Sequence, residues 1–180
     1  MTRIVALLRG INLGRTNRIG MADLRELLAE IGFDDARTHL QSGNVVLTAG
    51  QPPDTVARAI GAGIEERFGI AVDVIVRTGE ELAGVVEANP LGDVATDGSK
   101  HFVVFLAAEP ERAALDALAE RDFAPDEFRA AGRELYVWCP QGMRDSALMK
   151  ALGKRPWGPA ATVRNWNTVT KVLAMVREAG

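Results

Sequence analysis

One order of predicted elements, which occurs twice along the chain, constrains the fold of this sequence most. In each half, an apolar strand is followed by an amphipathic helix, two short strands, a second helix and another strand. The predicted strands cover residues 3–8, 36–41, 44–48 and 72–77, and then residues 101–107, 127–131, 134–139 and 161–164. This βαββαβ order is that of the ferredoxin-like motif, whose helices cover one face of an antiparallel sheet. We therefore predict an α+β fold of two ferredoxin-like halves, related by duplication and packed into one compact unit with antiparallel or mixed sheets.

Helical periodicity and turn residues separate these strands. Apolar side chains at helical spacing predict helices over residues 21–31, 54–68, 145–152 and 167–178. Shorter helices are expected after the capping box at residues 78–81 and after Pro110. Asn89-Pro90 ends the first half. Residues 1–90 are thus predicted to form one subdomain and residues 101–180 another, with residues 91–100 as the linker.

Composition narrows the class of protein. The chain has 180 residues, of which 47% are hydrophobic and 25% charged, as in folded globular proteins. Its single cysteine, Cys139, excludes a disulfide within the chain and suits a reducing compartment. The apolar run Ile4–Leu8 stops at Arg9, which is too short for a signal segment or a membrane span. We therefore expect a cytoplasmic protein that does not contact the membrane.

Charge is distributed unevenly along the chain. Residues 1–20 carry a net charge of +4 and residues 141–180 of +5, whereas residues 21–140 carry −12. If the two ends meet in space, they form a basic surface on an acidic protein, and such a surface favours anionic ligands. The alternative is a scatter of solvated Arg and Lys side chains.

The first candidate site residues are Arg9, Asn12 and Asn17, in the loop that follows the first strand. A glycine-bearing loop between a strand and a helix lets main-chain N–H groups approach an anion closely. The spacing matches neither a P-loop nor a G-x-G-x-x-G motif. The alternative is that the Gly and Asn residues serve positions with positive φ.

Two further polar motifs supply the other candidates. Gln41 and Asn44 flank Ser42-Gly43, which is also good turn chemistry. Near the start of the last helix, Trp166 could stack on a ring, and either Asn167 or Thr168 could cap the helix. A helix N-terminus beside an arginine is a suitable anion site. The candidates of this third motif are Arg164, Asn165, Trp166, Asn167, Thr168 and Lys171.

Signals for catalysis or cofactors are weak. His39 and His101 both fall in predicted strands, and no Cys/His cluster has metal-ligand spacing. No G-x-S-x-G elbow is present, and Cys139 ends an apolar strand. We therefore assign no catalytic residue, no metal ligand and no cofactor.

The three motifs together resemble a known family. The matching segments are Ala6–Asn12, Gln41–Val46 and Arg164–Val169 with Lys171. They are similar to those of the domain-of-unknown-function family DUF1697 of small bacterial proteins, over essentially the whole chain. The resemblance implies two related ferredoxin-like halves and brings no assigned activity.

This sequence departs from the family pattern in three places. The family pattern near Pro140 resembles P-x-G-x-G-x-S-K-L. In this sequence Arg144 stands in place of the second Gly and Ala147 in place of Lys, which weakens a phosphate-binding role for that loop. His39 stands where an aromatic residue is common, which argues against a catalytic role for it. The stretch Arg155–Pro159 also differs from the family.

Three hypotheses follow. The preferred one is a binding module, in which the three motifs converge on a basic site for a nucleotide, a phosphorylated metabolite or single-stranded nucleic acid. The second is a metal-independent enzyme that acts on a small anionic substrate. The third is that the motifs are structural and satisfy buried main-chain groups. The oligomeric state is left open.

Overall fold

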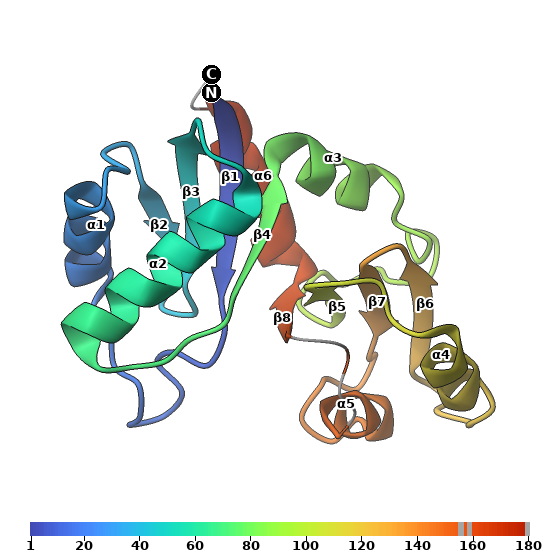
Figure 1. Ribbon diagram of the computed structural model, residues 1–180. Coiled ribbons are helices and arrows are strands. Elements are labelled where there is room, and N and C mark those ends of the chain that lie inside the picture. Colours follow the sequence, from blue (N-terminus) through green and yellow to red (C-terminus); the bar gives the residue numbers. More distant parts are fainter. Residues whose placement is uncertain (155–156, 158–159, 179–180) are drawn as a thin grey trace. The chain divides into compact units, whose positions relative to one another are not determined.

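The computed structural model describes residues 1–154, 157 and 160–178, which form two four-stranded antiparallel sheets and six helices (Figure 1). The α+β class is confirmed. The chain divides into two compact units. Unit 1 comprises Met1–Gly84 and Val172–Gly180, and unit 2 comprises Val85–Lys171. The division falls within two helices, α3 (Gly79–Glu87) and α6 (Trp166–Glu178).

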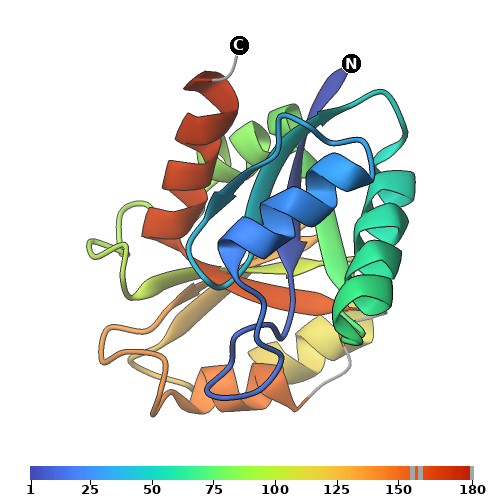
Figure 2. The same ribbon diagram turned by 90° about the vertical axis from the view of Figure 1, so that its left-hand side faces the viewer.

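The sheet of unit 1 has the strand order β2-β3-β1-β4. Its elements are β1 (Thr2–Leu8), α1 (Met21–Glu30), β2 (Arg37–His39), β3 (Asn44–Ala49), α2 (Pro53–Phe68) and β4 (Val74–Thr78). Helices α1 and α2 cover one face of this sheet (Figures 1 and 2). Alternate residues of β1, namely Ile4, Ala6 and Leu8, point into the core beneath these helices, because side chains alternate along a strand. Leu24 and Leu28 of α1 meet them there.

The sheet of unit 2 has the strand order β6-β7-β5-β8. Its elements are α4 (Arg112–Ala119), α5 (Ala147–Gly153), and the strands β5 (His101–Leu106), β6 (Glu127–Ala131), β7 (Glu134–Trp138) and β8 (Ala161–Asn165). Phe102, Val104 and Leu106 of β5 form the core with Leu118 of α4 and Leu148 of α5. When the four strands of each sheet are numbered in chain order, both sheets have the strand order 2-3-1-4.

Some predicted boundaries are corrected by the structure. The strand predicted at residues 36–41 is only β2, because Leu40 has a φ of 59° and turns the chain. The last helix begins at Trp166 rather than at residue 167, because Asn165 caps it: its Oδ1 accepts from the N–H of Thr168 at 2.9 Å. Of the stretch Arg155–Pro159, only Trp157 lies within the described residues, where its Nε1 donates to the Leu152 carbonyl.

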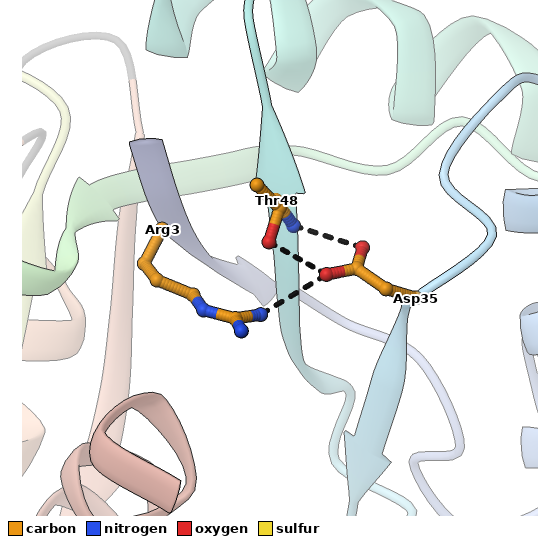
Figure 3. A network of polar contacts seen from close by, with 3 residues as sticks. All are labelled: Arg3, Asp35 and Thr48. Atoms are coloured by element: carbon orange, nitrogen blue, oxygen red, sulfur yellow. Dashed lines mark hydrogen bonds and ion pairs between the residues drawn. The ribbon is translucent and has the colours of Figure 1, made fainter. Parts of the chain in front are cut away.

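A polar network ties the segment before β2 to the neighbouring strands of unit 1 (Figure 3). Asp35 accepts from the Arg3 guanidinium at 3.0 Å, from the Thr48 hydroxyl at 2.6 Å and from the Thr48 N–H at 3.0 Å. Partial burial alone would raise the pKa of the Asp35 carboxyl, but the Thr48 hydrogen bonds and the Arg3 charge outweigh it, so the pKa lies below its usual value. The network therefore favours the ionised carboxylate.

Replacing Asp35 by alanine should lower the free energy of unfolding by about 1 kcal/mol at pH 7, because its partners are partly exposed and screened by water. Since the folded-state pKa is lowered, this contribution is present above the unfolded pKa of about 4 and is lost as the pH falls below it. Urea denaturation at pH 7 and at low pH measures both effects. Asp34→Ala, at the exposed neighbouring position, is the control. Equal losses for Asp34→Ala and Asp35→Ala would contradict the network's role.

Candidate functional site

The N-terminal loop, residues Arg9–Gly20, leaves the end of β1 and leads to α1 (dark blue in Figure 2). Asn12 holds its two ends together. The Asn12 side-chain amide donates to the carbonyls of Ile19 at 2.9 Å and Gln41 at 2.8 Å, and its Oδ1 accepts from the Ile19 N–H at 2.9 Å. Its main-chain N–H donates to the Asn17 carbonyl at 2.9 Å. Asn12 is therefore the residue that closes the loop.

Positive φ angles bend the same loop. Gly10, Asn12, Gly14 and Asn17 have φ angles of 76°, 53°, 58° and 50°. Asn and Gly tolerate this region better than other residues do. The Asn17 amide donates to the Gly10 carbonyl at 3.0 Å, so the second asparagine also has a main-chain partner. These four residues therefore occupy positive-φ positions, as the alternative expects.

The turn at residues 40–43 packs directly against this loop. The Leu8 N–H donates to the Gly43 carbonyl at 2.8 Å, and a Cβ added to Gly43 would lie 2.7 Å from side-chain atoms of Leu8 and Ile11. Asn44 is buried, and its amide donates to the His39 carbonyl at 2.7 Å and to the Ser42 hydroxyl at 3.1 Å. The first two sequence motifs thus meet in unit 1, and they do so largely through main-chain hydrogen bonds.

Three arginine side chains lie on the exposed surface of the N-terminal loop. Arg9, Arg15 and Arg18 are exposed, and the loop carries no acidic residue. The Arg9 guanidinium pairs with Asp73 at 3.1 Å, and Arg18 donates to the Gly14 carbonyl at 3.0 Å. Arg15 has no ion-pair partner within the described part of the chain. A depression of about 240 Å³ adjoins the loop and is lined by Arg9, Gly10, Asn17 and Ala71–Asp73.

The third motif, residues 164–171, lies in unit 2, and its arginine is buried. Arg164 is buried, and its guanidinium donates to the Thr162 hydroxyl and to the Val163 carbonyl, both at 2.8 Å. Burial lowers the pKa of the Arg164 guanidinium to about 10. Two hydrogen bonds of the Arg164 guanidinium therefore go to groups of its own strand, β8.

The start of α6 is also largely occupied by the protein itself. The Asn165 side chain takes the Thr168 N–H, and the Asn167 N–H donates to the Gly98 carbonyl at 3.4 Å. The Asn167 side chain packs against Gly98, so a Cβ at Gly98 would overlap it. Of the candidates here, Thr168 is buried, whereas Asn167 and Lys171 are exposed.

Trp166 stacks on His101, a contact that the sequence did not indicate. The ring centroids lie 4.6 Å apart and the planes differ by 18°. His101 is completely buried, and neither ring nitrogen has a hydrogen-bond partner among residues 1–154, 157 and 160–178. Burial lowers the pKa of the His101 imidazole to about 4, so the ring is neutral at physiological pH. Trp166 is thus engaged with a neutral aromatic neighbour.

A second polar cluster joins Asp126, Cys139 and Ser146, which lie far apart in the chain. The Ser146 hydroxyl donates to Asp126 at 2.7 Å and accepts from the Met149 N–H at 2.9 Å, which caps α5. Cys139 lies 3.5 Å from the same hydroxyl. Burial of the Cys139 thiol raises its pKa, which disfavours a reactive thiolate.

Comparison with known proteins identifies the family. The family model described as "Protein of unknown function (DUF1697)" matches residues 1–136. The chain belongs to the DUF1697 family. The match includes the N-terminal loop and the residue 40–43 turn.

A solved bacterial structure shows the same fold. "The structure of conserved bacterial protein SP0830 from Streptococcus pneumoniae" covers 97% of this chain and 98% of its own, with a TM-score of 0.79 and 21% sequence identity. At this identity the likeness shows the fold alone. No curated protein matches the chain.

No helix in the described part of the chain is both long and apolar enough to cross a bilayer. Within the same residues, no three or more His, Cys, Asp or Glu side chains are grouped so that they could hold a metal ion.

Replacing His101 by phenylalanine should remove a pH dependence of stability. The unfolded chain has the ordinary His pKa of about 6.5 and takes up the proton first as the pH falls, so the folded state loses up to about 3 kcal/mol between pH 6.5 and 4. Above pH 6.5 this loss is absent. Urea unfolding from pH 7 to pH 4.5 should therefore show a shallower decline for His101→Phe, which keeps the stacked ring, than for the wild type.

His39→Phe removes the other histidine and is the control. Its pH profile should retain the steep decline that His101 causes. Identical profiles for His101→Phe and the wild type would show that the buried imidazole does not resist protonation.

Proposed function

We propose that this DUF1697 protein is a binding module for an anionic ligand and that the N-terminal loop is its recognition surface. The ligand class is a nucleotide, a phosphorylated metabolite or single-stranded nucleic acid. Arg15 and Arg18 are the principal contacts, and Arg9 exchanges its exposed pair with Asp73 for the ligand. Exposed Asn167 and Lys171 in unit 2 are secondary candidates.

The observation that carries the proposal is three exposed arginines on a loop without acidic residues whose main chain is fixed by Asn12 and Asn17. A fixed loop loses little conformational freedom on binding, so more of the interaction energy appears as affinity. Arginine presents five N–H donors in a planar fork that suits phosphate oxygens. The adjoining depression supplies room for a small anion beside Arg9.

A structural role is the second candidate for part of the motif residues. The side chains of Asn12, Asn44 and Arg164 all donate to main-chain carbonyls. Such bonds satisfy acceptors that would otherwise be left without a partner. In our proposal these side chains build the scaffold, and the exposed arginines meet the ligand.

Two equivalences support the further proposal that the halves are duplicated ferredoxin-like units. The orders β2-β3-β1-β4 and β6-β7-β5-β8 place equivalent strands in equivalent positions. Arg77 on β4 lies opposite Val5, as Arg164 on β8 lies opposite Val103. Each arginine is buried and donates to the carbonyl of the preceding residue at 2.8 Å.

The double variant Arg15→Ala/Arg18→Ala should bind anions at least roughly tenfold more weakly than the wild type, because two charge-assisted contacts are lost. Calorimetry with inorganic pyrophosphate and nucleoside triphosphates tests the small-molecule classes. Fluorescence anisotropy with a labelled single-stranded oligonucleotide tests the nucleic-acid class. Affinity for the oligonucleotide should fall steeply with added salt.

Arg25→Ala/Arg58→Ala, on α1 and α2 of the same unit, removes the same charge elsewhere. This control should keep wild-type affinity if the loop is the site. If both double variants lost the same affinity, the loss would come from the lower net charge and not from a site on the loop. No binding of any probe by the wild type would sink the proposal.

A further inference from the structure

Strand β6 is an open edge of the unit 2 sheet. Among the strands of the described residues it pairs only with β7, and Arg129, Ala130 and Ala131 are exposed. The opposite edge strand, β8, alternates buried and half-buried residues. An exposed edge offers unpaired main-chain N–H and C=O groups to another strand.

The β6–β7 turn determines which main-chain groups point outward. The two strands are joined by two residues, Gly132 and Arg133, and Gly132 has a φ of 56°. In such a hairpin the flanking residues form a hydrogen-bonded pair, and hydrogen-bonded pairs alternate along the ladder. The N–H and C=O groups of Phe128 and Ala130 therefore point away from β7. Consistent with this, the Phe128 carbonyl accepts from the Arg129 guanidinium at 2.8 Å.

Space for another strand lies beside this edge. An open depression of about 730 Å³ is lined by residues 127–130 of β6 and by residues of the preceding segment, including Phe123. Its walls combine apolar side chains with charges of both signs. A strand added there would meet both the main-chain groups and these side chains.

The charge pattern of β6 is complementary to itself. If two copies of β6 pair antiparallel about Phe128, Glu127 of each copy lies opposite Arg129 of the other. The two Phe128 residues then exchange main-chain hydrogen bonds. Residues directly opposite in an antiparallel pair interact, and opposite charges stabilise the pair. Pairing about Arg129 would instead place the two Arg129 side chains opposite each other, which is unfavourable.

We propose that β6 is a homodimer interface, in which a second copy of this chain adds its β6 edge antiparallel about Phe128 and joins the two unit 2 sheets into one. The Glu127–Arg129 ion pair, which is 3.4 Å long within one chain, is exchanged for two ion pairs between chains. The Phe128 carbonyl, which accepts from the Arg129 guanidinium in the single chain, then accepts from the N–H of the partner's Phe128. The edge is short, so the dissociation constant is on the order of 100 μM.

Sedimentation velocity from about 10 μM to about 1 mM tests the proposal, because dimer should accumulate across that range. Arg129→Glu and Glu127→Arg should each remain monomeric, since each places like charges opposite one another. An equimolar mixture of these two variants should regain the dimer, because every opposing pair is then of opposite charge. Ala130→Pro removes an outward N–H without touching the β6–β7 ladder and should also weaken the dimer.

Arg112→Glu reverses an exposed charge on α4 of the same unit and should leave dimerisation unchanged. Melting temperatures of all variants verify that they fold. A wild-type chain that stays monomeric at about 1 mM overturns the proposal. Arg129 would then be a charged residue that prevents another strand from pairing with this edge. A dimer that survives Arg129→Glu places the interface elsewhere and overturns it equally.

Discussion

The polar main chain of the N-terminal loop must find hydrogen-bond partners, and the Asn12 side chain supplies three of them. Asn12 joins the two ends of the N-terminal loop and reaches the Gln41 carbonyl in the adjacent turn. The β1–β3 ladder ends at the pair Leu7 and Asn44, and the next main-chain N–H, that of Leu8, donates to the Gly43 carbonyl in the adjacent turn. The position of the exposed arginines follows from this closure.

Three edge strands, β4 in unit 1 and β6 and β8 in unit 2, share one hydrogen bond between an arginine and the main chain. On β4, β6 and β8, an arginine donates to the carbonyl of the residue before it, at 2.8 Å in each case. Arg77 and Arg164 are buried, whereas Arg129 is exposed. An arginine long enough to fold back on its own strand satisfies an outward carbonyl that no neighbouring strand takes. The exposure of β6 makes it the edge best able to accept a partner strand.

The sequence predicted the order of elements well because periodicity and turn residues are local signals. The strand at residues 161–164, which had the least support in the sequence, is present as β8. Burial was harder to predict. The sequence motifs propose Arg164 and Asn44 as ligand contacts, whereas in the structure both side chains are buried and donate to main-chain carbonyls. The His101–Trp166 stack joins residues that are distant in sequence, so no local pattern could reveal it.

The most direct test of the account compares Asn12→Gly with Asn17→Gly by urea unfolding. Both substitutions accommodate the positive φ, so they differ in the side-chain bonds removed: three at Asn12 and one at exposed Asn17. We expect Asn12→Gly to lower the free energy of unfolding by about 2–3 kcal/mol and Asn17→Gly by less than about 1 kcal/mol. Equal and small losses at both positions would show that Asn12 does not hold the loop.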